Sequence, residues 1–174
     1  MRIISGKHKS KKIIAPHNLS VRPTTDRAKE ALFNILNNRY YFDGKNVLDL
    51  FSGTGNISYE FASRGIEEII SVDRNYNCIK FIDSTSKELK MNISTIKSDG
   101  LSFLKNCKKQ FNFIFADPPY NYDNYSEIVS LVKENNLVKK DGCLIIEHDN
   151  TTSFNDNNIE IKKYGAVHFS LFSF

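Results

Sequence analysis

The chain has 174 residues and a net charge of +4, and its 40% hydrophobic and 25% charged content is typical of one globular domain with a small extension. No apolar run approaches the roughly 20 residues of a membrane-spanning helix, and the start lacks the apolar stretch of a signal peptide. The three cysteines form no C-x-x-C pair and the four histidines do not cluster, so we expect no disulfide framework, no metal site and a cytoplasmic location.

The positive charge is concentrated at the start of the chain. Residues 1–29 carry eight Lys or Arg and one acid, a net charge of +7, whereas residues 30–174 carry 16 basic and 19 acidic side chains, a net charge of −3. Such a basic segment attracts a polyphosphate partner. A solvated tail is the alternative, but the isoleucine pairs 3–4 and 13–14 offer apolar anchors that favour a folded, functional arm.

The first expected elements belong to this arm. Residues 2–5 and 12–15 are short β-like runs around a Gly-Lys turn and predict a small hairpin. The segment Arg22–Asp26 predicts a helix start, because its threonines can cap the helix and Asp26 stands in the first turn. Apolar residues at helical spacing continue this helix to about residue 36.

From residue 46 onward, predicted strands and helices alternate. Strands are expected at residues 47–50, 68–72, 93–97, 111–116 and 143–147, with two more between 159 and 174. Helices are expected from the turn after the first strand to about residue 64, at 76–89, shortly after residue 100, and at 124–135. This alternation predicts an α/β fold with a mostly parallel sheet covered on both faces. We divide the chain into a basic extension, residues 1–45, and a main domain, residues 46–174.

Acidic residues follow four consecutive predicted strands, at Asp49, Asp73, Asp99 and Asp117. Ligands of such sheets bind at the carboxyl ends of the strands, and four acids there are hard to attribute to turn chemistry alone. The first acid opens the glycine-rich turn Asp49–Gly55, where the backbone can pass close to a ligand without a side-chain clash.

The composition of this turn narrows the choice of ligand. A dinucleotide fingerprint needs a third glycine where Ser58 stands, and a phosphate-binding loop needs a Gly-Lys-Ser/Thr that is absent. A cofactor without phosphates fits better. S-adenosylmethionine has a ribose whose hydroxyls Asp73 can bind, and its positive charges suit acidic loops.

Over residues 46–147 the chain resembles the class I S-adenosylmethionine-dependent methyltransferases. This resemblance implies a Rossmann-like fold with a seven-stranded sheet flanked by helices, and it implies that Asp99 accepts from the adenine amino group. The expected cofactor-binding residues are Asp49, Phe51, Ser52, Gly53, Thr54, Gly55, Asp73, Arg74, Asp99 and Gly100.

The segment Asp117–Tyr120, with the sequence Asp-Pro-Pro-Tyr, follows an apolar strand and carries the expected catalytic residues: Asp117, Pro118, Pro119 and Tyr120. An exocyclic amine on a base is a poor nucleophile, because its lone pair is delocalised into the ring. The Asp117 carboxylate and the Pro118 carbonyl can each accept one N–H bond and fix the nitrogen, while the prolines stiffen the loop. Tyr120 offers a face on which a flipped base can stack. The motif fits adenine N6, cytosine N4, guanine N2 or a protein glutamine.

The N-terminal third narrows the choice among these amines. Residues 2–6, 11–13 and 22–33, together with the glycine turn and the Asp-Pro-Pro-Tyr segment, resemble the RsmD family of bacterial 16S rRNA guanine-N2 methyltransferases. The resemblance implies 2-methylguanine formation at position 966 of 16S rRNA, on a small subunit or its assembly intermediate, by a protein that we expect to be a monomer. The expected RNA-binding residues are Arg2, Lys7, Lys9, Lys11, Lys12, Arg22, Thr24, Thr25 and Arg27. One departure is the stretch 56–59, Asn-Ile-Ser-Tyr, which replaces a small, apolar run.

Other functions remain as alternatives. A DNA or other RNA amino-methyltransferase, acting on adenine N6 or cytosine N4, is compatible with the motif, although this chain has no room for a large target-recognition insertion. A non-catalytic RNA-binding assembly factor would more readily have lost the strand-end acids. A protein-glutamine methyltransferase would leave the basic arm unexplained.

Overall fold

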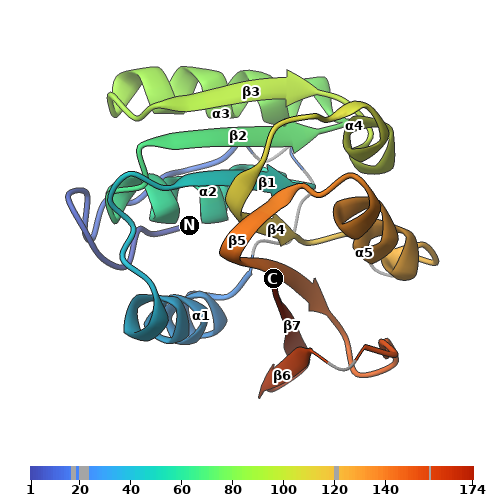
Figure 1. Ribbon diagram of the computed structural model, residues 1–174. Helices are drawn as coiled ribbons and strands as arrows, with labels where there is room; N and C mark the ends of the chain where they lie inside the picture. The colour runs from blue at the N-terminus through green and yellow to red at the C-terminus, as the bar shows by residue number, and fades with distance from the viewer. Residues whose placement is uncertain (17–18, 20–23, 120–121, 157) are drawn as a thin grey trace.

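A computed structural model describes residues 1–16, 19, 24–119, 122–156 and 158–174. Within these residues one sheet of seven strands has the order β3-β2-β1-β4-β5-β7-β6. The strands are β1 (Asn46–Leu50), β2 (Glu68–Asp73), β3 (Ile93–Lys97), β4 (Phe111–Ala116), β5 (Val138–His148), β6 (Ile159–Tyr164) and β7 (Val167–Ser173). Strands β1 to β5 are parallel, whereas β7 runs antiparallel to β5 and β6, so the expected mostly parallel sheet is confirmed and its far edge is antiparallel (Figure 1).

Five helices flank the sheet: α1 (Asp26–Arg39), α2 (Asn56–Ser63), α3 (Tyr76–Glu88), α4 (Gly100–Asn106) and α5 (Tyr125–Glu134). Each lies within one or two residues of its expected position, except that α1 continues to Arg39. Strand β5 begins five residues before the expected start at residue 143. The early part, residues 138–142, is polar and contains a glycine, and the pairing of β5 with β4 shifts register there. A run of this composition is typical of a turn, which explains the difference.

The two faces of the sheet bury separate apolar clusters. Residues from α1, α2 and α3 pack with the odd-numbered side chains of β1, β4 and β5, such as Val47, Phe113 and Ile145. Residues from α4 and α5 pack with the even-numbered ones, such as Leu48 and Ile114. Side chains alternate between faces along a strand, so Asp49, Asp117 and Glu147 project from the face that carries α1, α2 and α3.

The N-terminal arm lies against the C-terminal end of α2. Residues 2–5 and 12–15 run side by side, but only Arg2 and Lys12 form a β-bridge, so the expected hairpin is held by isolated bonds rather than by two strands. Gly6, with φ of 84°, packs so tightly that a Cβ atom would lie 1.9 Å from the Ser63 carbonyl oxygen. The amide of Lys7 donates to that oxygen at 2.7 Å.

A buried carboxylate fixes this arm to the main body. The amides of Ile4 and Ser5 donate to the two oxygens of Glu60 at 2.8 and 3.1 Å. The cations of Lys29 and Arg64 lie 3.4 and 2.7 Å from the same carboxylate, and all three charged side chains are almost fully buried. Buried charges are tolerated when every one is paired and hydrogen bonded, as here. The extension therefore folds onto α2 as part of one unit.

Helix α1 starts where the sequence predicts. Thr25 adopts an extended conformation, and its side chain accepts from the amide of Ala28. This N-cap satisfies one of the free amides of the first turn. None of the helices built from the described residues is long and apolar enough to cross a bilayer.

Candidate functional site

A cavity of about 650 Å³ opens at the carboxyl ends of the parallel strands. Its wall is formed by the turns after β1, β2, β3 and β4, by the end of β5, and by the turn between β6 and β7. All ten expected cofactor-binding residues except Gly55 line it, and so do the expected catalytic residues Asp117, Pro118 and Pro119. Tyr120 lies outside the described residues. The structure thus brings the glycine turn and the Asp-Pro-Pro segment to one cavity.

The glycine turn is shaped by three residues in left-handed conformations: Phe51, Gly53 and Gly55, with φ of 59°, 52° and 82°. A Cβ atom on Gly55 would lie 2.9 Å from the side chains of Tyr59 and Ile82, so this glycine allows α2 and α3 to approach each other. Gly55 therefore shapes the turn without lining the cavity, which is lined by residues that precede it in the turn.

Asp73 is held at the end of β2 by two backbone amides. The amide of Gly53 donates to one carboxylate oxygen at 2.8 Å, and the amide of Asn75 donates to the other at 2.7 Å. Each carboxylate oxygen can accept a second bond. The side chain is thus preorganised and keeps acceptor capacity toward the cavity, as a ligand with two adjacent hydroxyls requires.

Asp49 is fully buried beneath the glycine turn. Its carboxylate accepts a hydrogen bond of 2.5 Å from the Ser58 hydroxyl, and Ser58 lies 2.7 Å from the hydroxyl of Ser71. Burial raises the pKa of Asp49 to about 7, although the Ser58 hydrogen bond opposes the shift. The unexpected polarity of the stretch 56–59 therefore has a physical reason: Ser58 supplies a donor to a carboxylate that water does not reach.

Asp99 caps helix α4. Its side chain accepts from the amide of Ser102 at 3.0 Å, which is the ordinary N-cap role. Its second oxygen receives no donor from the described residues. Next to it, Gly100 lies so close to Phe51 that an added Cβ atom would be 2.6 Å from the ring. Gly100 is therefore placed for packing against Phe51, and the exposed Asp99 is placed for a polar ligand group.

Two aromatic side chains form an apolar side of the cavity. The ring of Phe51 meets that of Tyr122 edge to face, with centroids 5.4 Å apart. The Tyr122 hydroxyl is buried and has no hydrogen-bond partner among the residues described. Burial also raises the pKa of Tyr122 to about 12, so the hydroxyl stays protonated. A buried donor without a partner beside a flat apolar wall fits an adenosyl-type ligand with a ring and polar substituents.

The Asp117 segment faces a second carboxylate that the sequence analysis missed. Phe115 of β4 pairs with Ile145 of β5, and Asp117 and Glu147 each stand two residues further along these neighbouring strands. Burial, and then the nearby Glu147 and Asp49, raise the pKa of Asp117 well above its usual value. Like charges at this edge therefore disfavour full ionisation, as in other paired carboxylates.

Glu147 is tied to the extension. The Thr24 hydroxyl donates to Glu147 Oε2 at 2.7 Å, and the Thr24 backbone carbonyl accepts from the side-chain amide of Asn56 at 3.0 Å. The Asn56 side-chain oxygen in turn accepts from Lys29 at 2.8 Å. Burial raises the pKa of Glu147 to about 7. Sequence alone could not find this residue, because a glutamate within an expected strand carries no motif and Thr24 stands 123 positions away.

The far end of the cavity is aromatic. Tyr125 packs edge to face against Tyr122 and His148, and His148 is buried, with its ring nitrogens bonded to the Asp149 carbonyl and the Ser170 hydroxyl. Burial lowers the pKa of His148, so the ring is neutral near pH 7. His148 is thus the last residue of β5, and it also lines the cavity.

Most of the expected RNA-binding residues lie away from this cavity. Lys7, Lys9, Lys12 and Arg27 are exposed, Arg2 pairs with Asp26 at 3.2 Å, and Lys11 pairs with Glu88 at 3.6 Å. Thr24 and Thr25 both line the cavity, and the side chain of Thr24 is buried against Glu147. Arg22 lies outside the described residues.

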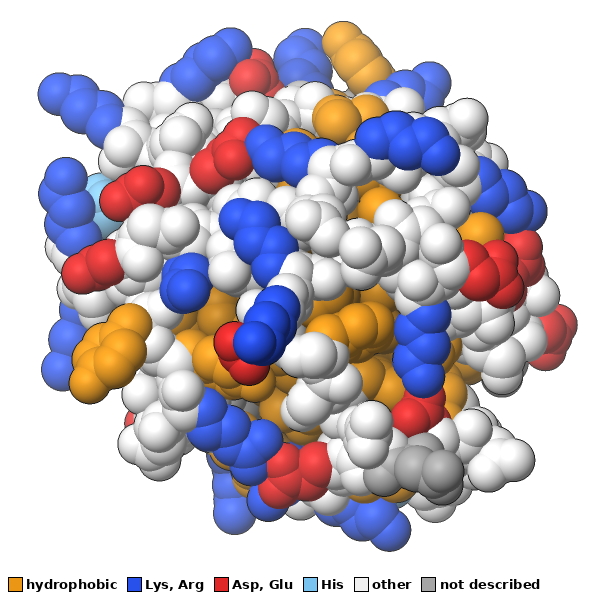
Figure 2. Space-filling view, viewed as in Figure 1, with side chains coloured by type: hydrophobic (Ala, Val, Ile, Leu, Met, Phe, Trp, Pro, Cys, Tyr) orange, Lys and Arg blue, Asp and Glu red, His pale blue; other side chains and the backbone are white. Residues whose placement is uncertain are grey.

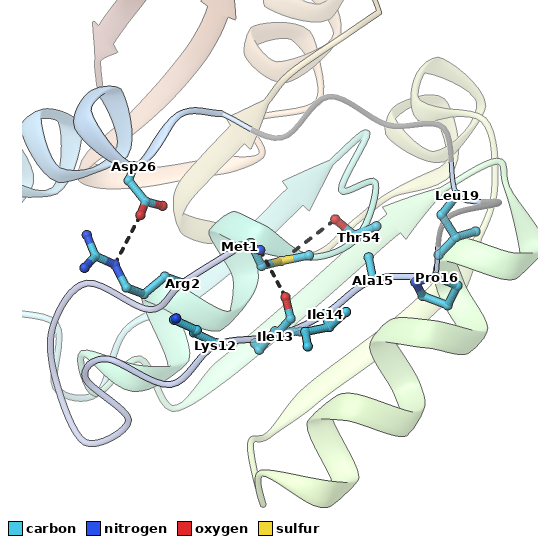
Figure 3. A pocket seen from close by; sticks show the side chains of 10 residues that line it. All are labelled: Met1, Arg2, Lys12, Ile13, Ile14, Ala15, Pro16, Leu19, Asp26 and Thr54. Atoms are coloured by element: carbon cyan, nitrogen blue, oxygen red, sulfur yellow. Dashed lines mark hydrogen bonds and ion pairs between the residues drawn. The ribbon is translucent and has the colours of Figure 1, made fainter.

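A second, shallower cavity of about 730 Å³ lies beside the arm (Figure 3). Figure 3 shows Arg2 directed toward Asp26 at one end and Met1 directed toward Thr54. Thr54 also lines the first cavity, so the two hollows adjoin at the glycine turn. No group of three or more possible metal ligands occurs in the parts of the chain that the structure describes.

Comparison with known proteins agrees with this architecture. The family model described as conserved hypothetical protein 95 matches residues 1–173. The Bacillus subtilis protein YlbH is 38% identical over 154 residues, covering 86% of this chain and 83% of that protein. Ribosomal RNA small subunit methyltransferase D of Buchnera aphidicola subsp. Baizongia pistaciae is 30% identical over 179 residues, covering 99% and 91%. The solved Escherichia coli protein yhhF superposes with a TM-score of 0.86 at 25% identity, covering 99% and 96%.

A more distant solved structure shares the fold. It is the Thermus thermophilus 16S rRNA N2 G1207 methyltransferase RsmC in complex with AdoMet and guanosine, with a TM-score of 0.69 at 16% identity over 86% of this chain and 43% of that chain. The fold and the cavity define a class I S-adenosylmethionine-dependent methyltransferase. Within that class, the chain belongs to the RsmD family.

Proposed function

We propose that this protein transfers a methyl group from S-adenosylmethionine to the exocyclic N2 of a guanine in 16S rRNA, at position 966. The observation that carries the proposal is the placement of the Asp117–Pro119 segment on the same cavity as the glycine turn and Asp73. Two similar proteins support the substrate: one is a ribosomal RNA small subunit methyltransferase, and the other is an N2-guanine methyltransferase of 16S rRNA.

The cofactor end of the cavity has the groups that an adenosyl compound needs. Asp73 accepts from the ribose hydroxyls with the capacity left by its two backbone bonds, and Asp99 accepts from the adenine amino group with its free oxygen. Phe51 and Tyr122 contact the flat faces of the ligand. When bound there, S-adenosylmethionine supplies a methyl group activated by a sulfonium. Asp49 lies buried beneath the cavity with a pKa of about 7, and a cation bound there favours the ionised form of this acid.

The amine is positioned by the Asp117 carboxylate and the Pro118 carbonyl. Two acceptors held on a proline-stiffened loop fix both amine hydrogens and direct the nitrogen lone pair toward the methyl. Asp117 also interacts with the positive charge that develops on the attacking nitrogen. Because burial, and then Glu147 and Asp49, raise the pKa of Asp117, its carboxylate is a stronger base than an exposed aspartate and can take up the released proton.

The extension, residues 1–45, is proposed as the RNA-facing part and residues 46–174 as the catalytic domain. The lysines of the arm are exposed, so their charges are accessible and can neutralise phosphates. Thr24 and Thr25 stand where the extension meets the cavity. A guanine flipped from an RNA loop would reach Asp117 from this side.

The test is transfer of labelled methyl from S-adenosylmethionine to small ribosomal subunits from cells that lack this protein, with the modified nucleoside identified and mapped. A single 2-methylguanosine is the expected result. Label in N6-methyladenine, in cytosine or on duplex DNA would overturn the substrate while leaving the fold in place. Cofactor binding without any transfer would overturn catalysis itself.

A further inference from the structure

The proposed chemistry at Asp117 leaves a neighbouring carboxylate without a function. Glu147 projects into the same cavity from the adjacent strand, in register with Asp117. Neighbouring strands lie about 4.8 Å apart. Two carboxylates at this spacing can contact adjacent positions of one planar base, so a base held by Asp117 would present its next edge atom to Glu147.

The state of Glu147 shows what kind of atom it can receive. Its Oε2 accepts from the Thr24 hydroxyl at 2.7 Å, while no donor among the described residues reaches Oε1. Thr24 is itself fixed by the bond that its carbonyl accepts from Asn56. In its ionised form, an acceptor that is oriented on one side and free on the other favours a donor from the ligand, because a buried carboxylate oxygen without a partner is costly.

The common bases differ at the atom beside the exocyclic amine. Guanine carries N1–H, a donor, next to its N2 amine. Adenine has the acceptor N1 next to its N6 amine, and cytosine has the acceptor N3 next to its N4 amine. Resting on the proposed methyltransferase function, we propose that Glu147 is the specificity-determining residue of this site, which accepts the N1–H of guanine while Asp117 and Pro118 hold N2.

Rejection of the other bases follows from the same contact. Adenine or cytosine placed with its amine at Asp117 would direct a lone pair at Glu147, and when Glu147 is ionised neither partner has a hydrogen to share. Sites that must leave a buried polar group unpaired discriminate strongly, whereas apolar pockets do not. Glu147 thus provides a physical reason why an Asp-Pro-Pro-Tyr segment, compatible with several amines, would select guanine here.

The experiment compares two bases that share the N2 amine. 2-Aminopurine keeps that amine but has an acceptor at N1 and lacks the N1 hydrogen. After the wild-type site is mapped, small subunits are reconstituted with ligated RNA that carries guanine or 2-aminopurine at that nucleotide. Methyl transfer is measured under single-turnover conditions with wild-type protein, Glu147→Gln and the control Glu160→Gln. Glu160 forms ion pairs with Arg39 and Lys162 on the surface and does not line the cavity.

The Glu147→Gln side chain keeps the size and the oxygen that Thr24 requires, and it presents an amide N–H₂ donor toward the base. We expect wild-type protein and Glu160→Gln to prefer guanine over 2-aminopurine by about 10²-fold, the cost of one lost bond to a buried charged group. Glu147→Gln should reduce this ratio at least tenfold, through slower transfer to guanine and unchanged or faster transfer to 2-aminopurine.

A ratio that stays at the wild-type value in Glu147→Gln would overturn the inference, even if both rates fall, because a purely structural role lowers both rates alike. Cofactor affinity and the melting temperature of each variant identify general damage. If Glu147→Gln does not fold, Glu147→Ala, which removes the acceptor, is compared in its place and should lose the preference for guanine; a preference kept at the wild-type ratio would overturn the inference. Wild-type protein that methylates no guanine would instead overturn the proposed function, before any variant is considered.

Discussion

Burial raises the pKa of three acidic residues at the carboxyl edge of the sheet, although each has a different partner. Asp49 is bonded to Ser58 inside the fold, Glu147 to Thr24 at the junction with the extension, and Asp117 stands between them at the cavity. Since a carboxylate desolvated in this way favours a nearby positive charge, the edge is suited to hold a sulfonium and a developing ammonium.

For Asp117 we predict a loss confined to the chemical step. Asp117→Asn removes the negative charge and the base but keeps the size of the side chain, so the methyl-transfer rate should fall by about 10³-fold. Calorimetric affinity for S-adenosylmethionine should change by less than about threefold, because other residues hold the cofactor. The matched control is Asp141→Asn, an exposed aspartate in a left-handed turn that asparagine also tolerates. A tenfold or smaller effect on the rate would remove Asp117 from the catalytic role.

For Asp49 the raised pKa becomes a dependence of stability on pH. The folded protein keeps the proton up to about pH 7, whereas an unfolded aspartate releases it near pH 4, so the folded state binds more protons between these values. The free energy of unfolding should therefore fall as the pH rises through this window.

Asp49→Asn removes this contribution, and in cofactor-free protein it should be the more stable form at pH 8 by up to about 4 kcal/mol, the free energy of a shift of about three pKa units. Urea unfolding at pH 5 and pH 8 measures the slope. Glu147 makes the free energy of unfolding depend on pH with the same sign. In Asp49→Asn this free energy should therefore still fall as the pH rises, but less steeply than in the wild-type protein. Parallel profiles for the two proteins would contradict a protonated Asp49.

At the scale of elements, the sequence predicts strands and helices well where an apolar run is bounded by turn residues. Strand β3 and strand β4 have the expected limits, and α1 starts at the expected threonine cap. What the sequence does not predict are contacts that exist only after elements dock. The role of Ser58 becomes clear only when it lies beside Asp49, and that of Glu60 only when the arm packs over it. The role of Glu147 becomes clear only when it lies beside Asp117. These pairings depend on the register of strands and on loops that bring distant residues together.

The docking of the arm on α2 gives a prediction at this scale. Gly6→Ala places a methyl group against the Ser63 carbonyl in a left-handed turn, so it should destabilise the protein by about 3 kcal/mol, combining backbone strain and overpacking. Gly44 also has a positive φ, of 69°, but nothing lies near its Cβ position, so Gly44→Ala should cost only about 1 kcal/mol. Denaturant unfolding of both variants measures the difference, and equal losses would mean that the arm is not held at Ser63.

At the scale of the whole molecule, the basic segment of the sequence is only one part of a mixed surface. Figure 2 shows Lys and Arg side chains around much of the outline of one face, with acidic side chains between them and apolar side chains visible near the middle. Elsewhere in the described chain, cations are paired with acids, as Lys87 is with Asp83 and Lys109 with Glu68. Net charge alone therefore does not define an RNA-binding face. The contribution of the arm lysines to RNA affinity must be compared with that of exposed lysines in the main domain.

The arm should contribute to RNA affinity through its charge. Replacement of Lys7, Lys9 and Lys12 by glutamine removes three exposed cations, and the slope of log affinity against log salt should decrease by about 2 to 3. The control replaces the exposed Lys108, Lys140 and Lys163 in the main domain, which changes the total charge equally. Filter binding to small-subunit RNA at several salt concentrations compares them. The same slope change in both triple variants would mean that the arm acts only through net charge.

The attachment of the arm also has a consequence for the order of events during synthesis. Ile4 and Ser5 are synthesised well before the carboxylate that receives their amides, which belongs to Glu60, 56 and 55 positions later. Chains fold as they emerge, and distant contacts wait for the later partner. The arm, with its lysines, therefore remains unattached until α2 has been made, and during that interval its lysines lie near the ribosome that is synthesising the chain.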